Sequence, residues 1–182
     1  MLRMQFFLGI DIPDPVKLQL SQQLQEFVKE YPYLSYTPVD NYHVTIQHFG
    51  DHNSPEKLHA LLDQTLYDIP AFELYTLGAG LFINHQIVLY VSFARKKLLE
   101  EIVKRVQQTT DIQSMKTYVP HLTFAKYKVP SKQQYLLIKK KLSNLNLDIT
   151  IPVDKLYLFE SISKGKQVSY QKVKEYPLLK EE

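Results

Sequence analysis

The 182-residue chain has no cysteine and no tryptophan, only five glycines, and no long hydrophobic run. Without cysteine, neither a disulfide framework nor a catalytic thiolate is available, and a cytoplasmic setting is permitted. No stretch reaches the roughly 20 apolar residues that a membrane-spanning helix needs. The apolar part of residues 1–12 is too short for a signal peptide and meets Asp11 almost at once. We therefore expect a cytoplasmic protein without membrane association.

Glycine is also missing where a loop that binds nucleoside triphosphates would need it. Gly78 and Gly80 lie within a strand-like pattern, and no Gly-Lys-[Ser/Thr] signature occurs. This absence counts against nucleoside-triphosphate chemistry.

Composition and charge indicate a globular protein with an uneven charge distribution. A hydrophobic content of 45% and a charged content of 23% suit one domain spanning residues 1–182, which we expect to be monomeric. Residues 121–182 carry 12 lysines and 6 acidic residues, so the second part is basic and residues 1–120 are weakly acidic. A basic half suits a polyanionic partner. Lysines on solvated helix faces, such as Lys139–Lys141, explain much of the charge equally well.

Periodicity predicts an α+β fold. Alternation of apolar and polar residues indicates strands, and apolar residues three or four apart indicate helices. The expected strands cover residues 4–12, 33–39, the segment of His43, 71–83, 86–93, the segment of His121, 149–160 and 167–174, and the expected helices cover 14–31, 54–66, 95–110 and 131–142. We expect antiparallel sheets flanked by helices, arranged as two lobes related by a pseudo-twofold axis.

The most informative feature is a repeated tripeptide. His43-Val44-Thr45 recurs as His121-Leu122-Thr123, and each copy lies in a short apolar run that predicts a strand. Chance would produce roughly 0.3 His-x-Thr tripeptides in a chain of this composition, so one copy alone is weak evidence. Two copies in matching contexts indicate two related halves of one site.

Alternate residues of a strand share a face, about 6.5–7 Å apart along the strand. His43 and Thr45 therefore point one way, and His121 and Thr123 do likewise on the second strand. Two imidazoles facing a phosphodiester supply one general base and one general acid, provided their environments separate their pKa values. The threonine hydroxyls would donate hydrogen bonds to the non-bridging phosphate oxygens.

Longer segments around these tripeptides resemble the two-histidine phosphoesterases. The most similar branch is the RNA 2′,3′-cyclic phosphodiesterase family, also called the 2′-5′ RNA ligase family. Residues 41–50 and 119–126 look like its paired motifs, and residues 6–13, 156–161 and Tyr170 match its outline. The resemblance spans almost the whole chain.

The resemblance implies a bilobal fold with a site cleft between two antiparallel sheets. It also implies metal- and cofactor-independent hydrolysis of a 2′,3′-cyclic phosphate on RNA or a nucleotide to a 2′-phosphate. By resemblance, His43 is the general acid and His121 the base, although sequence alone does not decide which histidine has which role. The alternatives are reversible 2′-5′ RNA ligation, a small cyclic nucleotide as substrate, and a non-catalytic RNA-binding module.

The chain departs from the family pattern at two equivalent positions. Lys126 stands where the family usually has arginine, which grips phosphate bidentately, whereas lysine acts as a point charge. We expect Lys126 to bind substrate phosphate, although strict alternation turns it away from the cleft unless the strand bulges or ends there. His48 stands where the family commonly has an aromatic residue, and alternation predicts a packed, hydrogen-bonded histidine facing the core.

The remaining histidines and aromatics carry weaker hypotheses. A zinc site from His43, His48, His52 and His59 is a minor alternative, because the spacing mixes strand, loop and helix and offers no cysteine. We expect surface positions for His52, His59 and His85. Strand parity alone makes three aromatic residues candidates for stacking on bases, namely Phe7, Tyr127 and Tyr157.

Overall fold

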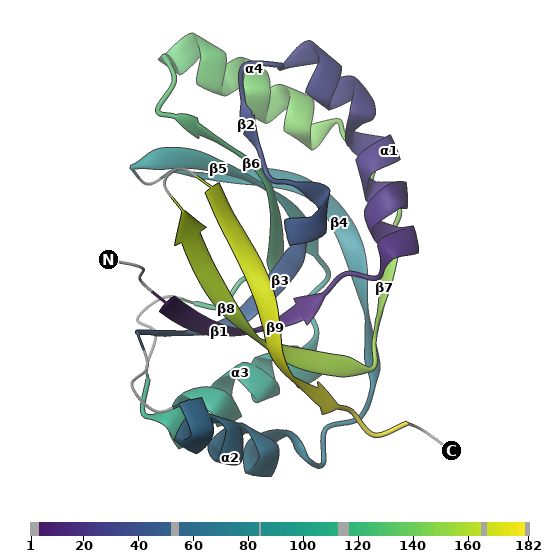
Figure 1. Cartoon of the computed structure of the whole chain (residues 1–182). Helices are drawn as coiled ribbons and strands as arrows, with labels where there is room; N and C mark the ends of the chain where they lie inside the picture. Colours follow the sequence, from purple (N-terminus) through teal and green to yellow (C-terminus); the bar gives the residue numbers. More distant parts are fainter. Residues whose placement is uncertain (1–3, 52–54, 84, 113–116, 165–166, 181–182) are drawn as a thin grey trace.

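Two antiparallel β-sheets form the centre of this computed structural model, which describes residues 4–51, 55–83, 85–112, 117–164 and 167–180 (Figure 1). Sheet 1 has the strand order β3-β1-β8-β9, and sheet 2 has the order β2-β6-β5-β4-β7. The expected α+β class with two antiparallel sheets is therefore confirmed. Within the described ranges, no helix is both long and apolar enough to cross a membrane.

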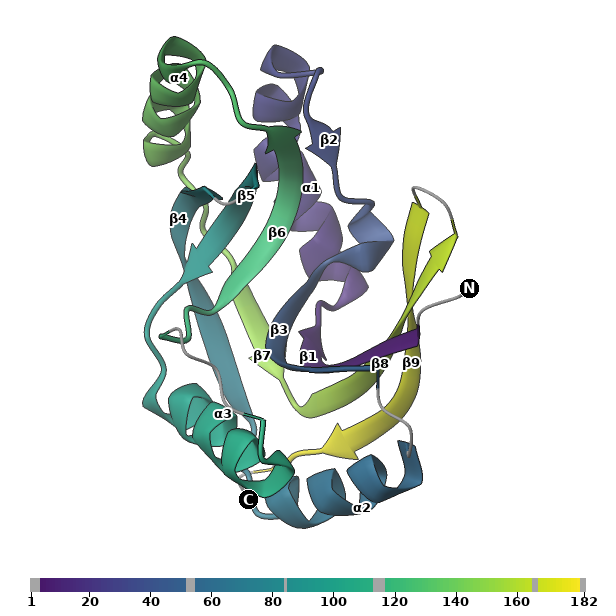
Figure 2. The same cartoon turned by 90° about the vertical axis from the view of Figure 1, so that its left-hand side faces the viewer.

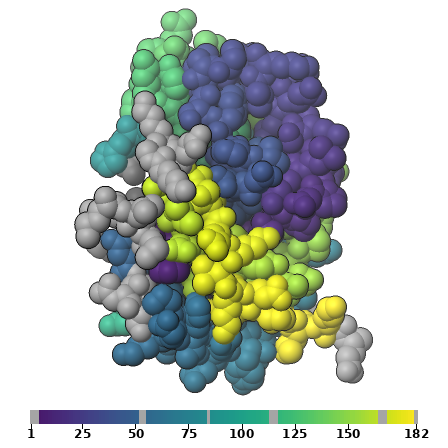
Figure 3. All heavy atoms as spheres, viewed as in Figure 1, coloured from purple at the N-terminus to yellow at the C-terminus, as the bar shows by residue number. Residues whose placement is uncertain are grey.

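Sheet 1 joins strands from both ends of the chain. It consists of β3 (His43–Gly50), β1 (Met4–Asp11), β8 (Lys155–Lys164) and β9 (Gln167–Pro177). The strand β1 lies between β3 and β8, so the first and last parts of the chain are held in one ladder. β9 forms the edge and lies in the middle of the face seen in Figure 3, with α1 to its right.

Sheet 2 brings the second tripeptide to its interior. It consists of β2 (Ser35–Tyr36), β6 (His121–Lys128), β5 (Gln86–Phe93), β4 (Phe72–Ile83) and β7 (Thr150–Val153). The strand expected over 149–160 was wrong in one respect, because β7 ends at Val153 and β8 begins at Lys155 in the other sheet. The alternation continues across this break, which is why periodicity alone did not reveal it.

The helices lie in two pairs, and a helix can pack on a different sheet from the strand that precedes it. They are α1 (Asp14–Glu30), α2 (Pro55–Leu66), α3 (Lys97–Thr110) and α4 (Lys132–Ser143), with a short 3₁₀ turn, η1 (Val39–Asn41). Figure 2 shows α1 and α4 at one end of the molecule and α2 and α3 at the opposite end. Phe27 of α1 meets Phe124 of β6 edge to face, although α1 directly follows β1 of sheet 1.

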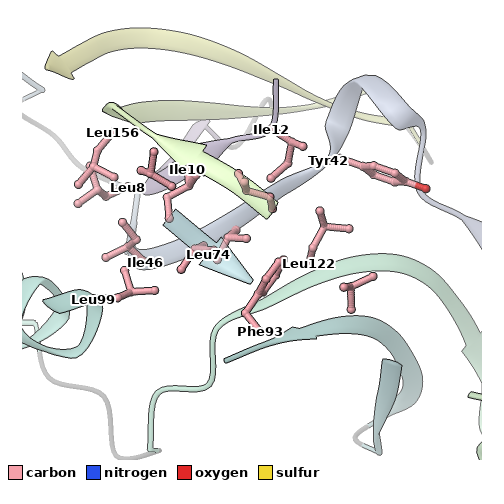
Figure 4. Packing of buried hydrophobic residues seen from close by; sticks show 14 of the residues in the cluster. Leu8, Ile10, Ile12, Tyr42, Ile46, Leu74, Phe93, Leu99, Leu122 and Leu156 are labelled. Atoms are coloured by element: carbon pink, nitrogen blue, oxygen red, sulfur yellow. The ribbon is translucent and has the colours of Figure 1, made fainter. Parts of the chain in front are cut away.

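The helix stripes explain this packing. In α3, Leu99, Ile102, Val103 and Val106 are all buried, and they recur at the spacing of one helix face. Figure 4 shows Ile46 of β3, Leu74 of β4 and Leu99 of α3 pointing toward one another. A continuous apolar core thus connects both sheets to the helices and fixes the strands that carry the tripeptides.

The helix α4 begins directly after Ser131, whose side chain caps it. Ser131 accepts a hydrogen bond from the backbone N–H of Gln134, and the Gln134 side chain accepts one from the Ser131 N–H. This capping box satisfies two backbone donors that a helix start leaves unpaired.

We predict that the residue between the second histidine and threonine is essential for stability. Leu122 is fully buried, so Leu122→Ala removes packed methyl groups and should lower the free energy of unfolding by about 2–5 kcal/mol. Leu136 on α4 is 53% exposed, and Leu136→Ala should change it by no more than about 0.5 kcal/mol. Urea unfolding of both variants measures the difference. Equal effects would contradict the placement of Leu122 in the core.

Candidate active site

A β-bulge follows each His-x-Thr tripeptide. In β3, Gly9 of β1 faces Thr45 and Leu8 faces Gln47, so Ile46 has no partner of its own. In β6, Tyr90 of β5 faces Thr123 and Leu89 faces Ala125, so Phe124 is skipped in the same way. One extra residue in a strand shifts every later side chain to the opposite face.

The bulges therefore place the functional side chains of each strand on one face of its sheet, which we call the site face. On sheet 1 it comprises Phe7, Gly9, Asp11, His43, Thr45, His48, Tyr157, Phe159, Tyr170 and Lys172. On sheet 2 it comprises Gly78, Gly80, Phe82, Val88, Tyr90, Ser92, His121, Thr123 and Lys126. Strands β3 and β6 lie side by side where the sheets meet (Figure 2). The structure thus brings both tripeptides together.

Both catalytic candidates are held by the same backbone contact. Nδ1 of His43 lies 2.8 Å from the Asn41 carbonyl oxygen, and Nδ1 of His121 lies 2.7 Å from that of Val119. A carbonyl only accepts, so each Nδ1 carries the hydrogen and Nε2 is the atom available for proton transfer. Nε2 of His43 also lies 3.1 Å from Thr45 Oγ1.

A hydrogen bond beside the first tripeptide also joins the two halves of the site. The hydroxyl of Tyr118, three residues before His121, donates a hydrogen bond to the Thr45 carbonyl oxygen at 3.0 Å. The burial of Tyr118 raises the pKa of its phenol far above the ordinary value, so the hydroxyl remains a donor. This bond sets the second strand against the first.

Aromatic rings surround His43 on sheet 1. The Phe7 ring lies 4.9 Å from the His43 ring and stacks on Phe159, while Tyr170 meets His43 edge to face at 4.7 Å. Gly9 lies against these rings, since a Cβ there would lie 3.4 Å from both the Phe7 and the Phe159 ring and 2.9 Å from the Val44 carbonyl oxygen. The imidazole is accordingly half-buried in an apolar wall.

This environment controls the protonation of His43. Burial is the main cause that lowers the pKa of His43 to about 4; the charges of His48 and His121 act in the same direction, and the Asn41 carbonyl and Asp11 oppose them. The ring is therefore neutral near pH 7 when no anion is bound. The same repulsion shows that His43 and His121 are near enough to interact electrostatically.

The structure corrects the expectation for His48. Alternation predicted a packed residue facing the core, but the bulge places His48 on the site face, where it is exposed. Its ring lies 5.5 Å from that of Phe7. Gln47 takes the buried position instead, with its amide bonded to the His48 carbonyl oxygen and to Gln107 of α3.

The matching bulge decides the orientation of Lys126 and Tyr127. Lys126 pairs with Val88 and lies exposed on the site face. The strand does bulge, which is the condition under which Lys126 was expected to face the cleft. Tyr127 was wrongly considered as a stacking residue, because it pairs with Ile87 on the opposite face and packs against the core. Phe7 is on the site face but only 2% exposed, so bases cannot stack on it.

The other histidines do not form a site with these residues. His85 is exposed, as expected, and His52 lies outside the described residues. His59 is half-buried on α2 and its Nε2 is enclosed, so the expectation of a surface position was wrong. Among the described residues, no group of three or more His, Asp or Glu side chains is arranged to hold a metal ion.

Sequence reasoning missed a polar pocket beside His43. Its lining includes Asp11, Lys17, Asn41, Tyr170 and Lys172. The Asp11 carboxylate binds the Lys172 ammonium at 2.6 Å and lies 3.5 Å from that of Lys17. These residues come from β1, α1 and β9, and no local motif links them.

Two partly exposed aromatic rings flank His121 and were also missed. Phe82 stacks on Tyr90 at 4.1 Å between ring centroids, and Phe82 meets the His121 ring edge to face at 5.1 Å. Gly80 lies beneath the Tyr90 ring, where a Cβ would approach its hydroxyl to 2.8 Å. Gly80, one of the two glycines in the strand-like pattern, therefore leaves space for this pair of rings.

Comparison with known proteins identifies the family. The family model of the 2′-5′ RNA ligase superfamily matches residues 9–165. The fold, with its paired histidines on adjoining sheets, and this match over most of the chain show that the chain belongs to the 2′-5′ RNA ligase superfamily. No curated protein sequence matches the chain.

Solved structures share the fold over nearly the full length. E. coli LigT complexed with 3′-AMP has a TM-score of 0.77 and 16% identity, with coverage of 97% of this chain and 98% of that chain. A structure described as a phosphoesterase has a TM-score of 0.76, 18% identity and coverage of 97% and 98%. Kluyveromyces marxianus Usb1 with uridine monophosphate has a TM-score of 0.53, 10% identity and coverage of 94% and 98%. These likenesses establish the fold.

The lowered pKa of His43 predicts a pH-dependent stability difference. The unfolded chain binds a proton at His43 near pH 6.5, whereas the folded chain binds it near pH 4, so acidification through this window favours unfolding. His43→Gln removes the titrating group. As pH falls from about 7 to 4, the free energy of unfolding of His43→Gln should therefore rise relative to that of the wild type, by at most about 3 kcal/mol.

Urea unfolding of both proteins at a series of pH values measures this difference. His85→Gln is the matched control, because His85 is exposed. A constant difference between wild type and His43→Gln across the window would show that His43 is not buried as described.

Proposed function

We propose that this protein hydrolyses 2′,3′-cyclic phosphate ends of RNA to 2′-phosphates, with His43 and His121 as the acid–base pair. The observation that carries the proposal is the matched pair of imidazoles, each fixed through Nδ1 with Nε2 available, on adjoining sheets. Membership of the 2′-5′ RNA ligase superfamily supports chemistry at phosphoesters. The nucleotides seen with similar proteins, such as 3′-AMP with LigT, support a nucleotide-bearing substrate.

The reaction is an in-line displacement at phosphorus. Nε2 of neutral His121 takes a proton from a water molecule, whose oxygen forms a bond to phosphorus. The bond from phosphorus to the ribose O3′ breaks, and Nε2–H of protonated His43 donates a proton to the departing oxygen. The product carries a 2′-phosphate and a 3′-hydroxyl, and the two histidines have exchanged protonation states.

The assignment of His43 as acid agrees with the resemblance and with its surroundings. A half-buried imidazolium whose pKa is lowered gives up its proton readily to an alkoxide leaving group. The bound phosphate supplies the negative charge that protonates His43 before reaction. His121 lies against the partly exposed Phe82 and Tyr90, so water reaches it more easily.

Three further groups bind the phosphate in this proposal. Thr45 and Thr123 donate hydrogen bonds to the non-bridging oxygens, where charge builds up in the transition state. Lys126 lies on the same face and adds a positive charge at the end of a flexible stem. Histidine and lysine side chains provide the catalysis, so we expect hydrolysis to persist in the presence of a chelator.

Replacing either histidine should abolish most hydrolysis of an oligonucleotide with a cyclic phosphate end. His43→Gln and His121→Gln should each lower kcat at least about 100-fold while leaving RNA affinity within a few-fold. A pH profile cannot assign the roles, because acid and base enter the rate law symmetrically. A substrate in which sulfur replaces the leaving O3′ does distinguish the roles, because a thiolate departs without protonation.

On the 3′-thio substrate, His43→Gln should recover to within about tenfold of wild type, whereas His121→Gln should remain inactive. Recovery of His121→Gln instead would reverse the assignment. Equal loss of binding and activity in both variants, with unchanged melting temperatures, would favour a non-catalytic RNA-binding module.

A further inference from the structure

The two halves of the site carry a third pair of equivalent positions. His48 follows His43 by five residues, as Lys126 follows His121, and the same bulge precedes both. Both side chains lie exposed on the site face of their sheet. The pseudo-twofold relation therefore places a histidine in one half where the other half has a lysine.

His48 lies within reach of the site but not at its centre. Its ring contacts that of Phe7, which also contacts His43 and Phe159. Burial, and then the charge of His121, lower the pKa of His48. Thr45 and His48 are successive site-face residues of β3, which separates them by about 6.5–7 Å along the strand. The short imidazole of His48 can therefore contact a substrate group next to the scissile phosphate. The longer side chain of Lys126 can reach back to the scissile phosphate itself.

The neighbouring group on an RNA end is the next phosphate of the chain. An imidazole always retains at least one N–H donor, and a nearby phosphate stabilises its protonated form, which donates two hydrogen bonds. Phe7 contacts the His48 ring and is itself covered, so Phe7 offers no free face for a base.

We propose that His48 binds the phosphate on the 5′ side of the terminal nucleotide, so that the site prefers RNA ends of two or more nucleotides over cyclic mononucleotides. This inference rests on the proposed function and specifies its substrate. It makes His48 a specificity residue, separate from the proton transfers of His43 and His121.

The test uses three substrates with the same reacting end. They are cytidine 2′,3′-cyclic phosphate, the dinucleotide UpC with that cyclic end, and the same dinucleotide with a neutral methylphosphonate linkage. The variants are His48→Ala, His48→Gln and His48→Lys. Lys57→Ala on α2 is the control, because Lys57 is exposed and lies outside both site faces.

We expect His48→Ala to raise KM for the charged dinucleotide about tenfold and to leave KM for the other two substrates within about twofold of wild type. His48→Lys should keep or tighten binding of the charged dinucleotide and steepen its salt dependence. His48→Gln, which keeps a donor without a charge, should fall between them. Lys57→Ala should match wild type on all three substrates.

Equal effects of His48→Ala on all three substrates, or no effect on any, would overturn the proposal. An equal effect on both dinucleotides, with the mononucleotide unchanged, would also overturn it, because the contact would then be to the second nucleoside.

Failure of the proposed function is a distinguishable result. If wild type hydrolyses none of the three substrates, the cyclic phosphodiesterase proposal falls. The His48 contact is then decided by equilibrium binding of UpC bearing a 2′-phosphate and of its methylphosphonate analogue. Selective weakening of the charged ligand by His48→Ala supports the contact, and parallel weakening of both ligands, or of neither, refutes it.

Discussion

The hydrogen bond from an imidazole Nδ1 to the carbonyl two residues earlier is the interaction on which the site depends. It occurs at His43 with Asn41 and at His121 with Val119, at nearly equal lengths of 2.8 and 2.7 Å. Each bond selects one tautomer and points Nε2 away from its own backbone. The acceptors of both bonds are main-chain atoms, so the same contact occurs in both halves although the surrounding side chains differ.

The two halves of the site have equivalent backbone arrangements, but their histidines have different surroundings. Phe7, Phe159 and Tyr170 enclose His43, whereas the rings beside His121 are partly exposed. The resulting burial lowers the pKa of His43, although the backbone contacts of the two histidines are equivalent. Such an asymmetry is what a donor and an acceptor of protons require at one reaction centre.

The sequence predicted the fold class and the two strands of the site because both depend on local periodicity. It failed at His48 and Tyr127 because one unpaired residue in a strand reverses the face of everything that follows, and alternation cannot reveal where that residue lies. Lys126 shows the same limit, since its orientation depended on whether a bulge occurred. The pocket residues Asp11 and Lys172 meet only through sheet pairing between the two ends of the chain, so no spacing in the sequence marks them.

The most direct test of the account is to identify the product formed from an RNA end. An oligonucleotide with a 2′,3′-cyclic phosphate is incubated with the protein in ¹⁸O-labelled water containing a chelator, and the product is analysed by ³¹P NMR. The account predicts a single 2′-phosphate that carries one ¹⁸O atom, because water attacks phosphorus and O3′ departs. A 3′-phosphate, an unlabelled phosphate or the absence of turnover would contradict it.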